Sequence, residues 1–297
     1  MAAAWDSSAR RTPGERRLPG AALASNGIPP RWPNLCTRRH GTDFVCSPVP
    51  VLCVIPARLG SSRLPKKPLL PLAGDPLILW VVRRVADSGV ADRIVVATDA
   101  TEIVTVVERA GFEAAMTSTR HQSGTERVAE VAGLKAFSGF NLCVNVQGDE
   151  PLIAVEAIRG AVERVRRGDP IGTAAGALDR ALASDASRVK VVVGPTGRAL
   201  YFSRAPIPFD RDGSGTVVYH QHVGVYAYTR DALERWIRLP PVPEETWERL
   251  EQLRPLAHGI PIGVALFDRP AAPGVDTAED LKTVAALLAP QLREVSP

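Results

Sequence analysis

The segment Val51-Leu-Cys-Val-Ile-Pro-Ala-Arg-Leu-Gly-Ser-Ser-Arg-Leu-Pro-Lys-Lys-Pro68 begins as an apolar run and continues as a loop of small and basic residues. The apolar run predicts a buried β-strand at Val51–Pro56. In open α/β sheets ligands bind beyond the carboxyl ends of strands, so this loop is the first candidate site. Small residues let backbone N–H groups approach an anion, while arginine and lysine neutralise phosphate oxygens. The loop therefore fits a triphosphate, with a plain basic surface loop as the alternative. It matches neither GxxxxGK[ST] nor GxGxxG, which argues against P-loop hydrolysis and dinucleotide binding.

From Val51 onward, short β-rich runs alternate with amphipathic helical stretches, which is typical of an α/β fold. Near-continuously apolar strands favour a parallel sheet that is covered on both faces. The predicted strands are Val51–Pro56, Arg93–Thr98, Glu113–Thr117, Leu142–Gln147 and Gly172–Ala177, with helices at Pro76–Ser88, Thr101–Ala110, Thr125–Lys135 and Val155–Arg167. Past Val189 a β-rich insertion is expected, with strands at Val189–Val193, Ala199–Ser203 and His222–Tyr228. Helices at Arg230–Arg238 and Glu244–Leu256, a strand at Ile262–Phe267 and a helix at Thr277–Leu288 complete the expected order.

The charge of the chain is unevenly distributed. The net charge of the 297 residues is +4, and residues 1–50 alone hold seven arginines, no lysine and three acids, so the remainder is neutral. A neutral body lacks the basic face that nucleic-acid binding requires. The longest apolar run, Leu77–Val82, is too short to cross a bilayer. The sequence therefore predicts neither a nucleic-acid partner nor a membrane span.

The first 48 residues are rich in arginine and proline and show no periodicity, which predicts a flexible extension ahead of a single domain at residues 49–297. Such an extension is either an organellar transit peptide or the result of a translation start assigned too far upstream of a cytoplasmic protein. The cysteines, Cys36, Cys46, Cys53 and Cys143, form no CxxC pair. A zinc site is therefore not expected, and buried reduced thiols at Cys53 and Cys143 suit a reducing compartment.

Two carboxylates are candidates for holding a metal ion. Asp149 lies in Asn145–Pro151 directly after a predicted strand, and Asp276 lies in Gly274–Asp280 before a predicted helix. Mg²⁺ usually takes one or two protein carboxylates together with substrate phosphates. For Asp276 the alternative is a simple helix N-cap.

Seven segments together resemble the 3-deoxy-manno-octulosonate (Kdo) cytidylyltransferase family, also called CMP-Kdo synthetases. They are IPARLGSSRLPKKPL at 55–69, HQSGTER at 121–127, NVQGDEP at 145–151, YFSRAPIP at 201–208, HVGVYAY at 222–228, LEQLR at 250–254 and GVDTAEDL at 274–281. The first and third are shared in looser form by other sugar nucleotidyltransferases, whereas HQSGTER, HVGVYAY and LEQLR are more specific. The resemblance extends from Val51 to about Leu288.

The resemblance implies a Rossmann-like, glycosyltransferase-A-like nucleotidyltransferase domain with a mostly parallel sheet and a β-rich dimerisation insertion. It implies transfer of CMP from CTP to the anomeric hydroxyl of Kdo, with release of pyrophosphate, by a homodimer that uses Mg²⁺ and supplies lipopolysaccharide synthesis. The catalytic residues would be Arg58, Lys67 and Asp149, and the metal ligands Asp149 and Asp276. The nucleotide would meet Arg58, Ser62, Arg63, Lys67, Ser118 and Gln147, and the sugar acid Gln147, Arg204, His222, Tyr226, Glu251 and Gln252.

Two other functions stay open at this point. One is cytidylyl transfer to another acidic sugar, such as amino-Kdo or a sialic acid. The other is a non-catalytic nucleotide-binding dimer that kept the fold. Both partners of the expected reaction are anions, so charge neutralisation and in-line placement matter more than a covalent nucleophile on the protein. Cations facing carboxylates around one loop favour the enzyme.

Overall fold

The strand that opens the fold lies in the middle of a mostly parallel sheet. The computed structural model describes residues 49–60 and 63–295, with side chains up to residue 289. The sheet runs in the order β11-β7-β10-β6-β1-β4-β5. Along this path only β10 is antiparallel to its neighbours, β6 and β7. The strands are β1 (Val51–Ala57), β4 (Arg93–Thr98), β5 (Glu113–Met116), β6 (Leu142–Val146), β7 (Ile171–Leu178), β10 (Tyr219–Thr229) and β11 (Ile262–Pro270). The predicted α/β class is confirmed.

Two additional pairs of strands lie beside this path. β8 (Lys190–Val193) and β9 (Ala199–Ser203) form an antiparallel hairpin that joins β10 through the pairing of Lys190 with Gln221. β2 (Pro71–Leu72) and β3 (Asp75–Pro76) form a separate small ribbon. The β-rich stretch expected past residue 189 is therefore a hairpin, followed by a long strand that enters the central sheet.

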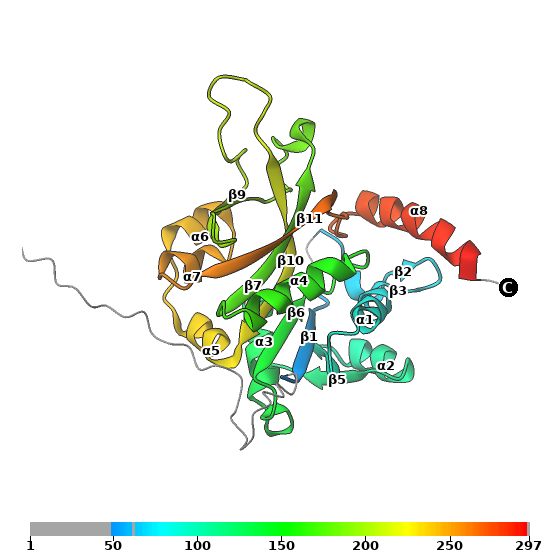
Figure 1. The fold of residues 1–297 in the computed structure, drawn as a ribbon. Coiled ribbons are helices and arrows are strands. Elements are labelled where there is room, and N and C mark those ends of the chain that lie inside the picture. Colours follow the sequence, from blue (N-terminus) through cyan, green and yellow to red (C-terminus); the bar gives the residue numbers. More distant parts are fainter. Residues whose placement is uncertain (1–48, 61–62, 296–297) are drawn as a thin grey trace, which may run out of the picture. The chain divides into compact units, whose positions relative to one another are not determined.

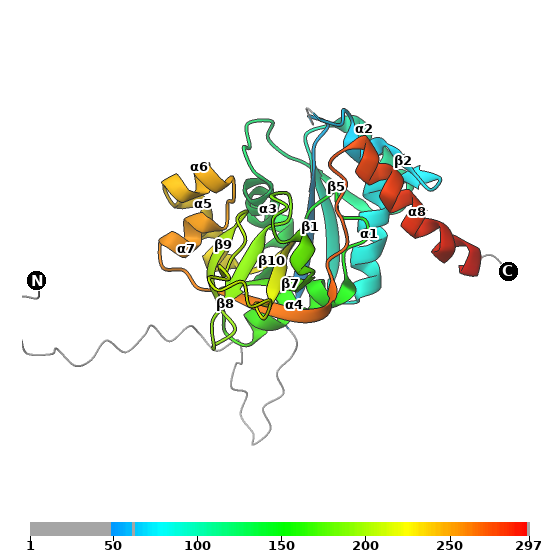
Figure 2. The same ribbon diagram turned by 90° about the horizontal axis from the view of Figure 1, so that it is seen from above.

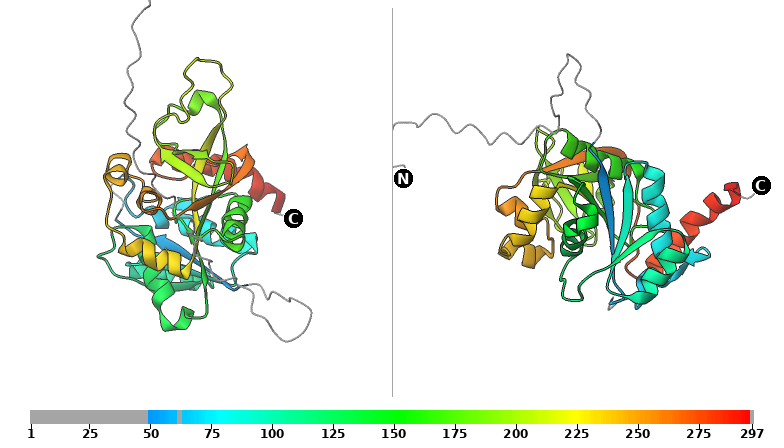
Figure 3. Two further views of the ribbon diagram at one scale, coloured as in Figure 1. Left: turned by 60° about the vertical axis from the view of Figure 1, so that its left-hand side comes forward. Right: turned by 90° about the horizontal axis from the view of Figure 1, so that it is seen from below.

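Helices cover both faces of the sheet (Figure 2; Figure 3). One core lies under α1 (Leu77–Ser88), α2 (Thr101–Arg109), α4 (Val155–Arg166) and α8 (Ala278–Val295). The other lies under α3 (Gly124–Gly133), α5 (Arg230–Arg238) and α7 (Leu253–Ala257). The remaining helical elements are α6 (Pro243–Glu248), η1 (Lys67–Leu69), η2 (Lys135–Phe137) and η3 (Arg180–Leu182). β1 is buried at all seven positions, as its apolar sequence predicts.

The single helix predicted at Glu244–Leu256 is wrong, because the chain forms α6 and α7 with a turn between them. Arg249 ends α6 in the left-handed region at φ 52°. The carbonyl of Glu248, which a continuous helix would bond internally, accepts a hydrogen bond from Nε of Arg204 at 2.7 Å. A tertiary contact thus replaces a helical one. Glu251 and Gln252 lie in the turn between α6 and α7, two helices that are labelled in Figure 1.

Cys53 and Cys143 are free and buried, as predicted. Burial raises the pKa of both thiols, that of Cys143 to about 11 even though the charge of Arg230 opposes the rise. Cys36, Cys46 and the predicted extension at residues 1–48 lie outside the described residues. Within residues 49–60 and 63–295, no helix is both long and apolar enough to cross a membrane.

Candidate active site

The loop after β1 lines a cavity of about 350 Å³ at the carboxyl end of the sheet. Arg58, Gly60, Arg63 and Lys67 come from this loop, and the other segments that line the cavity include 121–124 with Arg127, 147–149, Glu251 and Asp276. Arg58 is exposed and has no hydrogen-bond or ion-pair partner among the described residues. Ser62 lies outside the described residues. A cavity with an unpaired guanidinium and several further cations is suited to a polyanion.

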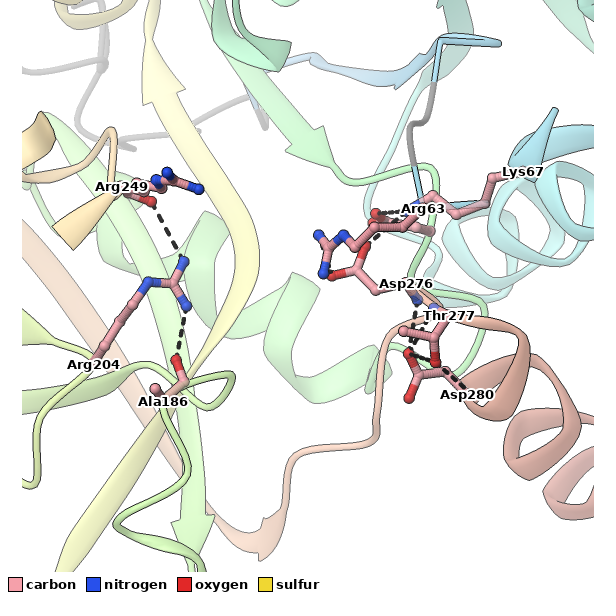
Figure 4. A network of polar contacts seen from close by, with 9 residues as sticks. Arg63, Lys67, Ala186, Arg204, Arg249, Asp276, Thr277 and Asp280 are labelled. Carbon is pink, nitrogen blue, oxygen red and sulfur yellow. Dashed lines mark hydrogen bonds and ion pairs between the residues drawn. The ribbon is translucent and has the colours of Figure 1, made fainter. Parts of the chain in front are cut away.

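Lys67 lies between the two predicted metal ligands. Its Nζ donates to Oδ2 of Asp149 at 2.6 Å and to Oδ1 of Asp276 at 3.0 Å. Arg63 donates to Oδ2 of Asp276 at 3.1 Å, and Figure 4 shows Arg63 and Lys67 on either side of this carboxylate. Burial alone would lower the pKa of Lys67, but the charges of Asp149 and Asp276 raise it above its usual value. Residues that are 209 and 82 positions apart from Lys67 in sequence thus meet at one ammonium group.

The same pair of carboxylates fits a magnesium ion. A cation already occupies the space that Asp149 and Asp276 share, and both groups offer hard oxygen donors. Among residues 49–60 and 63–295, no group of three or more His, Cys, Asp and Glu side chains is arranged to hold a metal ion. Two carboxylates are as many as Mg²⁺ usually takes from a protein when phosphates and water complete its coordination.

Backbone contacts set the position of Asp149. A Cβ on the preceding residue, Gly148, would lie 2.7 Å from the carbonyl oxygen of Pro56, so only glycine lets this turn approach β1. The carbonyl of Asp149 accepts a hydrogen bond from N–H of Val275 at 2.9 Å, which joins the two segments that carry the carboxylates.

Asp280 sets the position of Asp276. It accepts from the backbone N–H groups of Asp276 and Thr277 at 3.0 and 2.8 Å, and its own N–H donates to the Thr277 hydroxyl at 3.2 Å. This is a capping box at the start of α8, visible in Figure 4. Burial alone would raise the pKa of Asp280, but the hydrogen bonds from Thr277 and Asp276 lower it. Thr277, and not Asp276, is therefore the N-cap residue of α8. The carboxylate of Asp276 faces Lys67.

A second cavity, of about 550 Å³, shares Arg63, Asp149 and Asp276 with the first. Glu150, which sequence reasoning missed, lines it and accepts a hydrogen bond from N–H of Gly224 at 3.2 Å. Burial and the neighbouring Asp149 raise the pKa of Glu150 to about 7, against the opposing effect of that hydrogen bond. A Cβ at Gly224 would lie 2.5 Å from Glu150, so a glycine inside a predicted strand was the available signal.

The expected sugar-acid residues occupy β10 and the α6–α7 turn. His222 lines the second cavity and Glu251 the first, whereas Arg204, Tyr226 and Gln252 line neither of these two cavities. Glu251 accepts a hydrogen bond at 2.9 Å from the hydroxyl of Thr125, 126 residues earlier. Burial raises the pKa of Glu251 despite that bond, and burial raises the pKa of Tyr226. The side chains of Tyr226 and Gln252 are buried, yet neither has a hydrogen-bond partner among the described residues.

Arg204 is engaged with the backbone. Its guanidinium donates to the carbonyl oxygens of Glu248 at 2.7 Å, Ala186 at 2.8 Å and Arg249 at 3.5 Å. Figure 4 shows Arg204 between Ala186 and Arg249, apart from the Lys67 group. Three of its five N–H donors are used, so two remain for a ligand.

Residues 121–124 and Arg127 also line the first cavity. Ser123 accepts a hydrogen bond from N–H of Glu126 at 3.2 Å and caps α3, and buried Arg127 pairs with Asp99. His121 lines the first cavity and contacts Glu130. Ser118 lies behind it, where its N–H donates to Glu130 at 2.9 Å, and does not line the cavity.

The sequence departs from the pattern of the family that it resembles at Lys66, where a small or uncharged residue is usual, and at residues 185–190, where an asparagine-containing run is usual. Lys66 is exposed in the left-handed region at φ 55° and does not line the first cavity. The altered run at residues 185–190 keeps its turn, because Oδ1 of Asp185 accepts from N–H of Ser187 at 2.9 Å. An asparagine oxygen would make the same turn.

His222 should make stability depend on pH. Thr173 donates its hydroxyl proton to the Val225 carbonyl at 2.7 Å, so Nε2 of His222, 3.0 Å from that hydroxyl, is its donor. Burial lowers the pKa of His222 to about 3, below its usual 6.5. Between pH 6.5 and pH 3 the imidazole is therefore protonated in the unfolded chain but neutral in the folded chain. The folded state has its full stability from this residue above pH 6.5 and loses stability as the pH falls towards 3.

We expect the free energy of unfolding of the wild type to fall by about 1–2 kcal/mol more than that of His222→Gln between pH 7 and pH 5. Urea unfolding at the two pH values measures this difference. Equal losses in the two proteins would contradict the buried neutral imidazole.

The comparisons with known proteins agree with this geometry. The family model described as cytidylyltransferase matches residues 52–262. The 3-deoxy-manno-octulosonate cytidylyltransferase of Gemmatimonas aurantiaca is 52% identical over 238 residues, which are 78% of this chain and 92% of the relative. The chain belongs to the cytidylyltransferase family. The enzyme of the same name from Methylococcus capsulatus is 46% identical over 79% of this chain and 95% of its own length.

Solved structures confirm the fold of this cytidylyltransferase. CMP:2-keto-3-deoxy-manno-octonic acid synthetase complexed with CTP superimposes with a TM-score of 0.76 at 40% identity, covering 82% of this chain and 99% of the other. A putative glucose-1-phosphate thymidylyltransferase from Bacillus anthracis, at 16% identity and a TM-score of 0.57 over 80% of this chain and 94% of its own, shares the fold alone. The family predicted from the sequence is therefore confirmed.

Proposed function

We propose that this cytidylyltransferase transfers CMP from CTP to the anomeric hydroxyl of Kdo and releases pyrophosphate. The observation that carries the proposal is the group of Lys67, Asp149 and Asp276 where two cavities meet. A transfer between two anions needs two adjoining spaces with neutralising charge at their junction. Relatives named for this activity, 52% and 46% identical over most of this chain, support the choice of CTP and Kdo.

In this proposal the first cavity takes CTP. Arg58, Arg63 and Lys67 hold the triphosphate, since all three line the cavity and Arg58 has no partner among the described residues. Gln147 lines the same cavity between the nucleotide and the acceptor. Ser62 and Ser118 are kept as nucleotide contacts on the resemblance alone.

Asp149 and Asp276 would hold Mg²⁺ together with the phosphates. Bound there, the ion would neutralise charge at the α-phosphate and make the acceptor hydroxyl more acidic. With an ion held by both carboxylates, the ammonium group of Lys67 would be available to the triphosphate. Asp280 keeps Asp276 in position throughout.

The sugar acid is proposed to lie against Arg204, His222, Tyr226, Glu251 and Gln252. The two unused N–H donors of Arg204 are available for its carboxylate, and the unpartnered Tyr226 and Gln252 are available for hydroxyls. Neutral His222 offers Nδ1 as an acceptor. The anomeric oxygen forms a bond to the α-phosphorus, the bond from that phosphorus to the bridging oxygen breaks so that pyrophosphate leaves, and the hydroxyl proton passes to water. The protein needs no covalent nucleophile, and placement supplies much of the rate.

We also propose a homodimer and a reducing, cytoplasmic environment, with the product supplying lipopolysaccharide assembly. Leu200, Phe209 and Val218 on β9 and the following loop are 62%, 80% and 67% exposed, which supports a partner surface there. The free thiols support the environment. Light scattering should give twice the chain mass, and a monomer at micromolar concentration would contradict the dimer.

Phosphorus NMR of the purified protein with CTP, Kdo and Mg²⁺ tests the proposed reaction. We expect a new phosphodiester signal and pyrophosphate in equal amounts, both abolished by EDTA. Pyrophosphate with CMP alone, or no change in CTP, would contradict transfer to the sugar acid.

A further inference from the structure

Lys190 is a fully buried cation outside the group of residues described for CTP. It lies at 0% exposure on β8, paired in register with Gln221 of β10 and Ser203 of β9. Its Nζ donates to the carbonyl oxygens of Arg204 at 2.5 Å and Asp185 at 2.9 Å. It forms no ion pair with a carboxylate among the described residues. The ammonium group therefore connects the backbone at residue 185 with the backbone at residue 204, which are separated in the sequence.

Arg204 and Glu248 complete this connection. The carbonyl of Arg204 accepts from Lys190, while its side chain donates to the carbonyls of Ala186 and Glu248. The carboxylate of Glu248 in turn accepts from the Ser203 hydroxyl at 2.5 Å and from N–H of Arg204 at 2.8 Å. We call Lys190, Arg204 and Glu248, with the carbonyls of residues 185, 186 and 249, the Lys190 clasp.

The clasp anchors the segments that carry the sugar-acid residues. The α6–α7 turn begins at its Glu248 and Arg249 and delivers Glu251 and Gln252 within the next three positions. The residue next to Lys190, Val189, accepts through its carbonyl a hydrogen bond from N–H of His222 at 2.8 Å. The 185–188 segment also lines the second cavity.

A buried lysine at this position lowers the stability of the folded protein unless its ammonium group has a further role. Burial lowers the pKa of Lys190, with Asp185 and Glu248 partly opposing, so the ammonium is held at the expense of stability. An apolar side chain would avoid that penalty but would leave the Arg204 carbonyl without its hydrogen bond and the Asp185 carbonyl with only the N–H of Arg188, at 3.2 Å. The lysine thus fixes geometry, and the geometry it fixes is that of Arg204 and the α6–α7 turn.

We propose that Lys190 is a positioning residue for the acidic sugar: it sets the backbone of Arg204 and, through the clasp, the turn that presents Glu251 and Gln252. The inference rests on the proposed function and deepens it. Lys190 does not touch CTP residues, so its effect is specific to the acceptor.

The test compares Lys190→Met with the wild type in steady-state kinetics and hydrogen exchange. We expect the KM for Kdo to rise about tenfold or more, because small displacements of positioning groups are expensive, while the KM for CTP stays within twofold. Amides of residues 248–254 should exchange faster. Glu248→Gln, which keeps the size of the side chain, should shift the same KM and is available if Lys190→Met does not fold.

Arg230→Met is the matched control, since Arg230 also donates only to backbone carbonyls, those of Ala132, Phe137 and Phe140 at 2.7–3.1 Å. It follows the opposite end of β10 and should lower Tm with both KM values within twofold. A Lys190→Met protein that loses Tm but keeps the KM for Kdo overturns the inference. If the wild type is inactive with Kdo, the proposed function is overturned instead. In that case the clasp is tested by hydrogen exchange alone, and equal exchange of residues 248–254 in Lys190→Met and the wild type overturns it.

Discussion

Replacement of Asp149 by asparagine is expected to lower kcat by about 10²–10³-fold, the loss typical when a charged group aimed at the reacting centre is removed. The substitution keeps the size of the side chain, so the turn at Gly148 that approaches β1 should persist. It removes one of the two carboxylates that meet Lys67, which are the two ligands proposed for Mg²⁺. Pyrophosphate release at saturating CTP and Kdo measures the effect, and the Mg²⁺ concentration for half-maximal rate should rise.

Asp75→Asn is the matched control for that variant. Asp75 forms an ion pair of 2.5 Å with Arg83 and is 41% exposed, comparable to the 34% of Asp149, but lines neither cavity. Its kcat should stay within twofold of the wild type. If Asp149→Asn retained a third or more of the wild-type kcat, the role of this carboxylate in the reaction would be wrong.

Lys67→Met is expected to lower kcat/KM for CTP about 10³-fold. The variant loses a cation for the triphosphate and leaves Asp149 and Asp276 facing each other without the charge between them. Removing one partner from such a group costs about 3–5 kcal/mol where it is buried, less at this partly exposed site. Steady-state kinetics with CTP as the varied substrate measures the loss, and Lys67→Arg should recover part of it.

The neighbouring Lys66 provides a control one residue away. It is exposed, lies outside the first cavity and has no side-chain partner among the described residues. Lys66→Met changes the net charge of the loop by the same amount, so kcat/KM should remain within twofold. An equal loss in both variants would mean that only the overall charge of the loop matters.

Much of the fold could be predicted because the strands are apolar and end at recognisable loops. β1, β4 and β6 were predicted to within one residue, and the loop after β1 and Asp149 after β6 were predicted as candidate site residues from their places beyond strand ends. The joining of Asp149 with Asp276 also came from sequence, through resemblance. Local pattern and family motif agree at these positions.

Contacts between distant segments could not be predicted in this way. The hydrogen bond from Thr125 to Glu251 spans 126 residues, and the bonds from Arg204 to the carbonyls of residues 248 and 249 lie where the predicted helix is interrupted. Glu150 was missed because its importance depends on the close approach of Gly224, which only the sheet brings about. At each of these places a contact between segments that are distant in sequence determines the structure.

The most direct test of the central claim is kcat/KM for three acceptors, Kdo, amino-Kdo and N-acetylneuraminate, measured by Mg²⁺-dependent pyrophosphate release from CTP. We predict a kcat/KM for Kdo at least about tenfold above either alternative, a difference of about 1.4 kcal/mol in transition-state binding. A preference for another acid would support cytidylyl transfer but contradict the proposal that Kdo is the acceptor. No release with any acceptor from the folded wild type would contradict the enzyme itself.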